Sequence, residues 1–234
     1  MSLINYLTRI HFADGVLEDA LRAEIERLNI RRPLFVTDKG VQDAGVLERA
    51  LDATQTKPII FAETPWNPDE GSVARAAALY ADENCDGVVA IGGGSPIDLG
   101  KAAALRVSHT GPLASYTMVE GGLGRITGDL PPLIASPTTA GTGSEVGRGA
   151  LITFADGRKL GIISPHLIPT VAICDPTLTL SLPRHLTVGS GMDAVAHCIE
   201  TYVATAWNPP ADAIAIDGLR RASAHLERAS ANGG

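Results

Sequence analysis

This chain of 234 residues lacks several patterns that would define other classes of protein. It has only three cysteines and no C-x-x-C pair, so neither a disulfide framework nor a cysteine zinc site is expected. No run of Lys or Arg occurs and the formal net charge is −7, which argues against a nucleic-acid partner. No apolar run approaches a membrane span, and the N-terminus lacks the pattern of a secretory signal. We therefore expect a cytoplasmic protein without a membrane or nucleic-acid partner.

From Arg32 onward, short apolar runs alternate with longer segments of helical periodicity. This alternation is typical of the strands and crossover helices of a parallel sheet. The predicted strands are 32–38, 58–64, 86–95, 130–137 and 170–176, the predicted helices are 41–54, 69–85 and 96–108, and 149–163 reads as a hairpin with Asp156-Gly157 at its turn. The sequence thus predicts a doubly wound, Rossmann-like α/β domain.

After residue 180 the pattern becomes helical, with helices expected over 192–203 and 211–226. We place the boundary there. Residues 1–180 are predicted to form a dinucleotide-binding domain, and residues 181–234 the start of an all-helical domain.

The stretch "AIGGGSPIDLGKAAA" places Gly92, Gly93, Gly94 and Ser95 between a strand and a helix. Residues without a Cβ allow backbone N–H groups to approach a pyrophosphate, and the helix start favours an anion. The pattern matches neither the common dinucleotide fingerprint nor the P-loop. A tight turn that binds nothing therefore stays open as an alternative.

Asp38 follows the first clear strand in "VTDKG". Its carboxylate is suited to accept hydrogen bonds from an adenosine ribose and to repel a 2′-phosphate, which favours NAD over NADP. A helix N-cap is the alternative role for an Asp at this place.

Two further stretches carry polar chemistry. "SPTTAGTGSE" (136–145) puts five hydroxyl residues directly after an apolar strand, where they are able to donate hydrogen bonds to phosphate or ribose oxygens. A solvated loop is the alternative. "GMDAVAHCIETYV" places Asp193 and His197 four residues apart on one helical face, as two possible ligands of one cation. The alternative is a hydrogen-bonded pair, since a metal needs at least one or two more ligands.

Taken in this order, "VTDKG", "GGGSPIDLGKA", "SPTTAGTGSEV", "ICDPTLTLSLP" and "GMDAVAHCIETYVA" make the chain resemble the iron-containing (group III) alcohol dehydrogenases. The resemblance implies an NAD-dependent oxidoreductase that interconverts a small-molecule alcohol and its aldehyde or ketone, and it implies a homodimer. It implies a divalent metal, Fe²⁺ in most members and Zn²⁺ in some, with Asp193 and His197 as the first two ligands. The metal itself would be the catalytic group. The implied cofactor contacts are Asp38, Asn67, Gly93, Gly94, Ser95, Asp98, Thr138, Thr139, Thr142 and Lys159.

One departure from the family concerns the metal site. Members carry two further histidine ligands well downstream, and this sequence ends at "HLERASANGG". We therefore expect a fragment with exposed apolar helix faces, weak metal binding and little turnover. A maleylacetate reductase, a dehydroquinate-synthase-like lyase and a non-catalytic NAD-binding remnant are the alternative functions.

Overall fold

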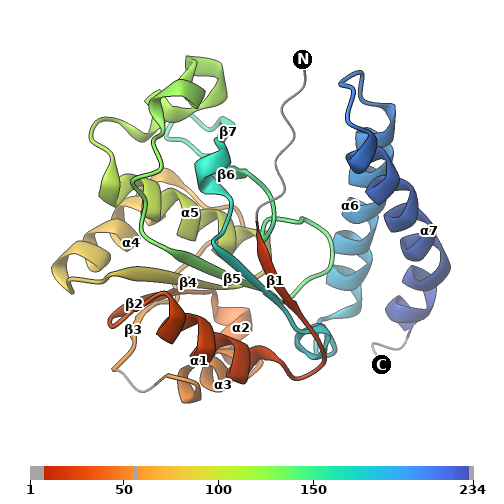
Figure 1. Cartoon of the computed structure of the whole chain (residues 1–234), viewed down its shortest axis with the longest axis horizontal. Coiled ribbons are helices and arrows are strands. Elements are labelled where there is room, and N and C mark those ends of the chain that lie inside the picture. The colour runs from red at the N-terminus through yellow and green to blue at the C-terminus, as the bar shows by residue number, and fades with distance from the viewer. Residues whose placement is uncertain (1–7, 55–56, 232–234) are drawn as a thin grey trace.

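The structure is a computed structural model that describes residues 8–54 and 57–231. At its centre is a six-stranded sheet with strand order β1-β8-β5-β4-β2-β3 (Figure 1). The strands are β1 (Arg9–Phe12), β2 (Pro33–Val36), β3 (Ile59–Phe61), β4 (Gly87–Gly92), β5 (Leu133–Pro137) and β8 (Val171–Cys174). Every pairing between them is parallel. The predicted parallel α/β sheet is confirmed.

Helices cover both faces of this sheet (Figure 1). α1 (Leu17–Arg27), α2 (Lys39–Asp43) and α3 (Val46–Asp52) lie on one face, and α4 (Glu70–Asp82) and α5 (Gly94–Ser108) lie on the other. Side chains alternate between these layers along each strand. In β2, Leu34 and Val36 join the core beneath α4 and α5, whereas Phe35 joins the core beneath α1 to α3. Because both faces are buried, β2 and β4 are apolar throughout.

A two-stranded antiparallel hairpin, β6 (Gly149–Thr153) and β7 (Lys159–Ile163), follows β5. Gly157 at its turn has a φ of +83°, which glycine adopts without strain. The predicted hairpin and its turn are confirmed. Short 3₁₀ helices fill other connections: η1 (Leu113–Tyr116), η2 (Met118–Glu120), η3 (Gly122–Arg125), η4 (Pro165–Leu167) and η5 (Pro176–Thr179).

Two long helices, α6 (Arg184–Val203) and α7 (Pro209–Ala231), form a pair beside the sheet (Figure 1). The Leu226 side chain of α7 packs against Gly191 of α6, where an added Cβ would lie 2.2 Å from Cδ1 of Leu226. Large apolar side chains stay exposed on the pair, among them Met192, Tyr202 and Ile214. The expected exposed apolar faces are therefore present. Among the helices of the described residues, none combines the length and apolar character needed to span a bilayer.

Two local expectations were wrong, and one strand and one helix were not predicted. The helix predicted over 41–54 is two helices, α2 and α3. Gly45, between them, has a φ of +72° and interrupts the helix. α6 begins at Arg184 instead of Met192, since Gly189 and Gly191 lie inside the helix and not in a loop. β1 and α1 precede Arg32, the residue at which the predicted elements begin. The boundary at residue 180 stays a prediction.

A buried carboxylate fixes β1 to α1. The Glu24 side chain is only 2% exposed, and its oxygens accept hydrogen bonds from Arg9 Nε at 2.6 Å, His11 Nε2 at 2.7 Å and Arg27 Nε at 2.5 Å. Burial alone would raise the pKa of Glu24. The bonds from His11, Arg27 and Arg9 outweigh burial, and the pKa lies below its ordinary value of 4.5.

We expect Glu24→Gln to lower the free energy of unfolding by about 1–3 kcal/mol at neutral pH, because it removes a hydrogen-bonded buried charge. A depressed folded-state pKa gives stability that is present above 4.5 and is lost as pH falls through the folded value. The difference from the unmodified protein should therefore shrink in acid. Urea unfolding across this range measures it.

Asp19→Asn is the matched control, because Asp19 lies on the same helix and its side chain is 88% exposed in its pair with Arg22. Its effect should stay below about 0.5 kcal/mol. Equal effects of the two substitutions would contradict a special role for Glu24.

Candidate functional site

The glycine-rich turn lies at the carboxyl end of β4, where α5 begins. Gly92 has a φ of +147°, and an added Cβ would lie 2.6 Å from Cγ of Pro96. Gly93 is the N-cap of α5 and has no side-chain cap. The turn thus requires glycine at Gly92, and it leaves the first N–H groups of α5 without a side-chain partner at the cap.

The threonine-rich loop packs directly against this turn. Thr138 N–H donates to the Gly92 carbonyl at 2.9 Å. A Cβ added at Gly93 would lie 3.4 Å from Cγ2 of Thr139, and a Cβ added at Gly94 would lie 2.8 Å from Cγ2 of Thr142. The two sequence motifs therefore meet, and side chains on the turn would fill the space between them.

Asp38 lies at the edge of the same turn. It is the N-cap of α2, and its Oδ1 accepts a hydrogen bond from Val41 N–H at 3.0 Å. Its Oδ2 lies 3.4 Å from the position of a Cβ at Gly92. The N-cap role, one of the two interpretations of Asp38, is present, and the second oxygen faces the glycine turn.

The loop after β3 joins the turn to the hairpin. Ser95 Oγ donates to the Trp66 carbonyl, and the next residue, Asn67, accepts a hydrogen bond at its Oδ1 from Lys159 Nζ at 2.9 Å. Asn67 and Lys159 are both exposed. The structure therefore brings Ser95, Asn67 and Lys159 into one neighbourhood, although they come from three separate parts of the chain.

Asp98 is buried and bonded to the protein. Its Oδ1 accepts from Ser144 Oγ at 2.7 Å, and its Oδ2 from Leu151 N–H at 2.9 Å. Burial raises its pKa above the ordinary value, and the nearby Lys101 ammonium offsets part of this rise. These contacts give Asp98 a structural role that the sequence did not indicate, while its cofactor contact stays a prediction.

Asp193 and His197 lie one turn apart on α6, with Oδ1 and Nε2 separated by 3.8 Å. Both side chains are about half exposed, at 44% and 50%. A carboxylate oxygen and an imidazole nitrogen are suitable donors for a divalent cation. Within the described residues, no group of three or more His, Cys, Asp or Glu is arranged to hold a metal. The pair is thus part of a donor set and not a complete one.

The pair is linked to the threonine loop through the backbone. At Gly141, an added Cβ would lie 2.2 Å from the carbonyl oxygen of Ser190, one turn before Asp193 on α6. Sequence reasoning missed this contact. Its only signal in the sequence was a glycine between Ala140 and Thr142 in the hydroxyl-rich loop.

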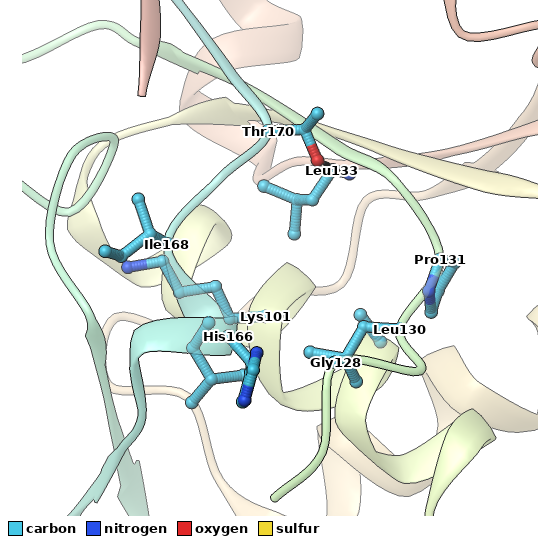
Figure 2. Close-up of a pocket in the computed structure, with 10 residues that line it drawn as sticks. Lys101, Gly128, Leu130, Pro131, Leu133, His166, Ile168 and Thr170 are labelled. Carbon is cyan, nitrogen blue, oxygen red and sulfur yellow. Dashed lines mark hydrogen bonds between the residues drawn. The ribbon is translucent and has the colours of Figure 1, made fainter. Parts of the chain in front are cut away.

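A small pocket of about 120 Å³ lies elsewhere (Figure 2). It is lined by Leu133, at the start of β5, and by Thr170, just before β8. This is the end of the sheet opposite the glycine turn. None of its lining residues is a predicted site residue.

The family model of iron-containing alcohol dehydrogenases matches residues 8–176. The chain belongs to this family. It is 57% identical over its whole length to a 4-hydroxybutyrate dehydrogenase of Cupriavidus necator and covers 61% of that protein.

Two solved structures have the same fold. A 1,3-propanediol oxidoreductase superposes with a TM-score of 0.93 at 33% identity, covering 100% of this chain and 61% of the other. A sulfoacetaldehyde reductase from Bifidobacterium kashiwanohense in complex with NAD⁺ has a TM-score of 0.90 at 32% identity, with 99% and 61% covered. The chain thus spans about three fifths of the length of these relatives.

We expect Gly141→Ala to separate the threonine loop from α6. The new methyl group would overlap with the Ser190 backbone, which cannot rotate away as a side chain can. The free energy of unfolding should fall by about 1–3 kcal/mol, and limited proteolysis should cut near the loop sooner.

Gly189→Ala adds the same methyl group on α6 beside Ser190, where nothing lies within 4 Å. In a helix interior it should be neutral or stabilising by up to about 1 kcal/mol. If Gly189→Ala destabilised the chain as much as Gly141→Ala, the effect of Gly141→Ala would not be due to the contact with Ser190.

Proposed function

We propose that this chain forms the nucleotide-binding part of an NAD-dependent oxidoreductase that interconverts an alcohol and its aldehyde or ketone at a divalent metal. The observation that carries the proposal is the packing of Thr139 and Thr142 against Gly93 and Gly94 at the carboxyl end of β4. In open parallel sheets, ligands bind in the crevice at this end of the strands. Family membership and the NAD⁺-bound relative support the same conclusion.

The residues of the turn fit a dinucleotide. At Gly94 a Cβ would lie 3.0 Å from Thr142 Oγ1, so the glycine lets the threonine hydroxyl come close to the start of α5. The N–H groups at the start of α5 would donate to the diphosphate, with Thr139 and Thr142 as hydroxyl donors. Asp38 would accept from the ribose through its free Oδ2. Asn67 and Lys159, already bonded to each other, would contact the cofactor from the hairpin side.

Asp193 and His197 fit a divalent metal in donor type, with Fe²⁺ as the first candidate and Zn²⁺ as the second. When bound, such a metal supplies Lewis-acid polarisation of the substrate oxygen, and the nicotinamide supplies a hydride acceptor. The close contact of Ser190 with Gly141 would hold the two ligands at a fixed position relative to the threonine loop. Oriented groups of this kind lower the entropic part of a reaction barrier.

The substrate class proposed first is a hydroxy acid of the 4-hydroxybutyrate type, because the relative with 57% identity carries that name. A primary or secondary alcohol without the acid group is the broader class.

We also propose that the chain divides into residues 1–180, the nucleotide-binding domain, and residues 181–234, the start of the helical domain. A cytoplasmic homodimer is also proposed. The cytoplasm is supported by three free cysteines, Cys85, Cys174 and Cys198. The dimer is supported by the apolar side chains exposed on α6 and α7.

Nucleotide titration by calorimetry tests the cofactor. The chain should bind NAD⁺ at least about tenfold more tightly than NADP⁺, because Asp38 repels the 2′-phosphate. Asp38→Asn keeps an N-cap side chain and removes the charge. The ratio of NAD⁺ to NADP⁺ affinity should therefore fall, while α2 stays intact.

Asp43→Asn is the control on the same helix, since the Asp43 side chain is 63% exposed in its pair with Lys39. It should leave the preference unchanged. Failure of the unmodified chain to bind either nucleotide would reject the proposed function.

Metal loading tests the second half of the proposal. With two protein ligands, the 234-residue chain should bind Fe²⁺ or Zn²⁺ weakly, lose it to a chelator and turn over 4-hydroxybutyrate, simple alcohols and maleylacetate slowly. Asp193→Asn should abolish the remaining metal binding. Tightly held stoichiometric iron that persists in this variant would show that other residues hold it.

A further inference from the structure

Lys101 is a charged residue enclosed in α5, two turns after the glycine-rich turn. Its side chain is 0% exposed. The ammonium group donates to the carbonyl of Gly147 at 2.9 Å and to that of Gly149 at 2.8 Å. It also lies 3.9 Å from Oδ1 of Asp98, three residues earlier on the helix. A buried lysine is thus bonded to the backbone just before and at the start of β6.

Asp98 binds the same segment from the preceding turn of α5. It accepts hydrogen bonds from Ser144 Oγ and from Leu151 N–H. Together with the two lysine bonds, four contacts tie one side of α5 to residues 144–151. This segment starts two residues after Thr142, whose side chain lies against Gly94.

Enclosing an ammonium group works against folding. Burial lowers the pKa of Lys101 to about 8, although the Asp98 and Glu145 carboxylates oppose this shift. An apolar side chain of similar volume at such a place is often neutral or stabilising. Fold stability alone is therefore a poor explanation for a lysine here, whereas two bonds to specified carbonyl groups define the path of a loop.

We propose that Lys101 is a positioning residue for the nucleotide site, which holds the loop 138–149 so that Thr139 and Thr142 stay against the glycine turn. This role rests on the proposed NAD-binding function. It also extends to the hairpin, because Gly149 begins β6, and Thr153 at the end of that strand pairs with Lys159. Lys101 itself would not touch the cofactor.

The pocket beside Lys101 offers a conservative variant (Figure 2). Lys101 is one of the residues that line this pocket of about 120 Å³, so the core beside the lysine is not completely filled. Lys101→Arg keeps the charge and the N–H donors. Lys101→Met has nearly the same length and removes both.

The experiment combines calorimetric NAD⁺ titration, hydrogen–deuterium exchange without nucleotide, and thermal unfolding. In Lys101→Met, peptides from 138–149 should exchange faster than in the unmodified chain, and NAD⁺ affinity should fall by about tenfold or more. Lys101→Arg should restore most of both. Lys57→Met is the matched control, because Lys57 is exposed and precedes β3 at the far end of the sheet; it should match the unmodified chain.

Three results would overturn the proposal. Unchanged loop exchange in folded Lys101→Met would show that the lysine does not hold the loop, whether or not NAD⁺ binds. Faster exchange with unchanged NAD⁺ affinity would leave Lys101 a role in the fold alone. No NAD⁺ binding by the unmodified chain would reject the proposed function, and the positioning role with it. If Lys101→Met does not fold, Lys101→Gln takes its place. It too should show faster exchange in 138–149 and weaker NAD⁺ binding.

Discussion

Tight packing against glycines around the carboxyl end of β4 is the constraint on which the rest of this structure depends. Gly92, Gly94 and Gly141 each lie where a Cβ would come within 3.0 Å of another residue. The neighbour is the Pro96 side chain at Gly92, the Thr142 side chain at Gly94 and the Ser190 backbone carbonyl at Gly141. The glycines therefore do more than permit turns, because they set the distances at which polar groups from separate elements meet.

Buried charge in this chain is concentrated where elements must be held in register. Glu24 joins α1 to β1, and Asp98 and Lys101 join α5 to the segment before and within β6. In each case the charged atoms bond to defined partners, which is the condition under which burial of an ion is tolerated. The apolar core supplies most of the driving force for folding, while these ionic contacts select one arrangement of the connecting segments.

The sequence predicted the elements that the core defines. β2 and β4 are buried on both faces, so their apolar runs are distinctive, and the Asp156-Gly157 turn identified the hairpin. β1 was missed because its alternation of Arg9 and His11 with exposed Ile10 and Phe12 is not that of a buried strand. The start of α6 was missed because two glycines inside a helix read as a loop.

For the candidate site, the sequence predicted which residues carry polar chemistry. It did not predict how segments that are far apart in the sequence come together. Lys101 and its carbonyl partners are separated by 46 and 48 residues, and no local pattern reports that pairing. The contact between Gly141 and Ser190 is of the same kind. Since Ser190 precedes Asp193 by one turn of a helix with a fixed rise, the position of Asp193 and His197 follows from that backbone contact. The threonine loop and α6 therefore form one geometric unit, and a change in either displaces the other.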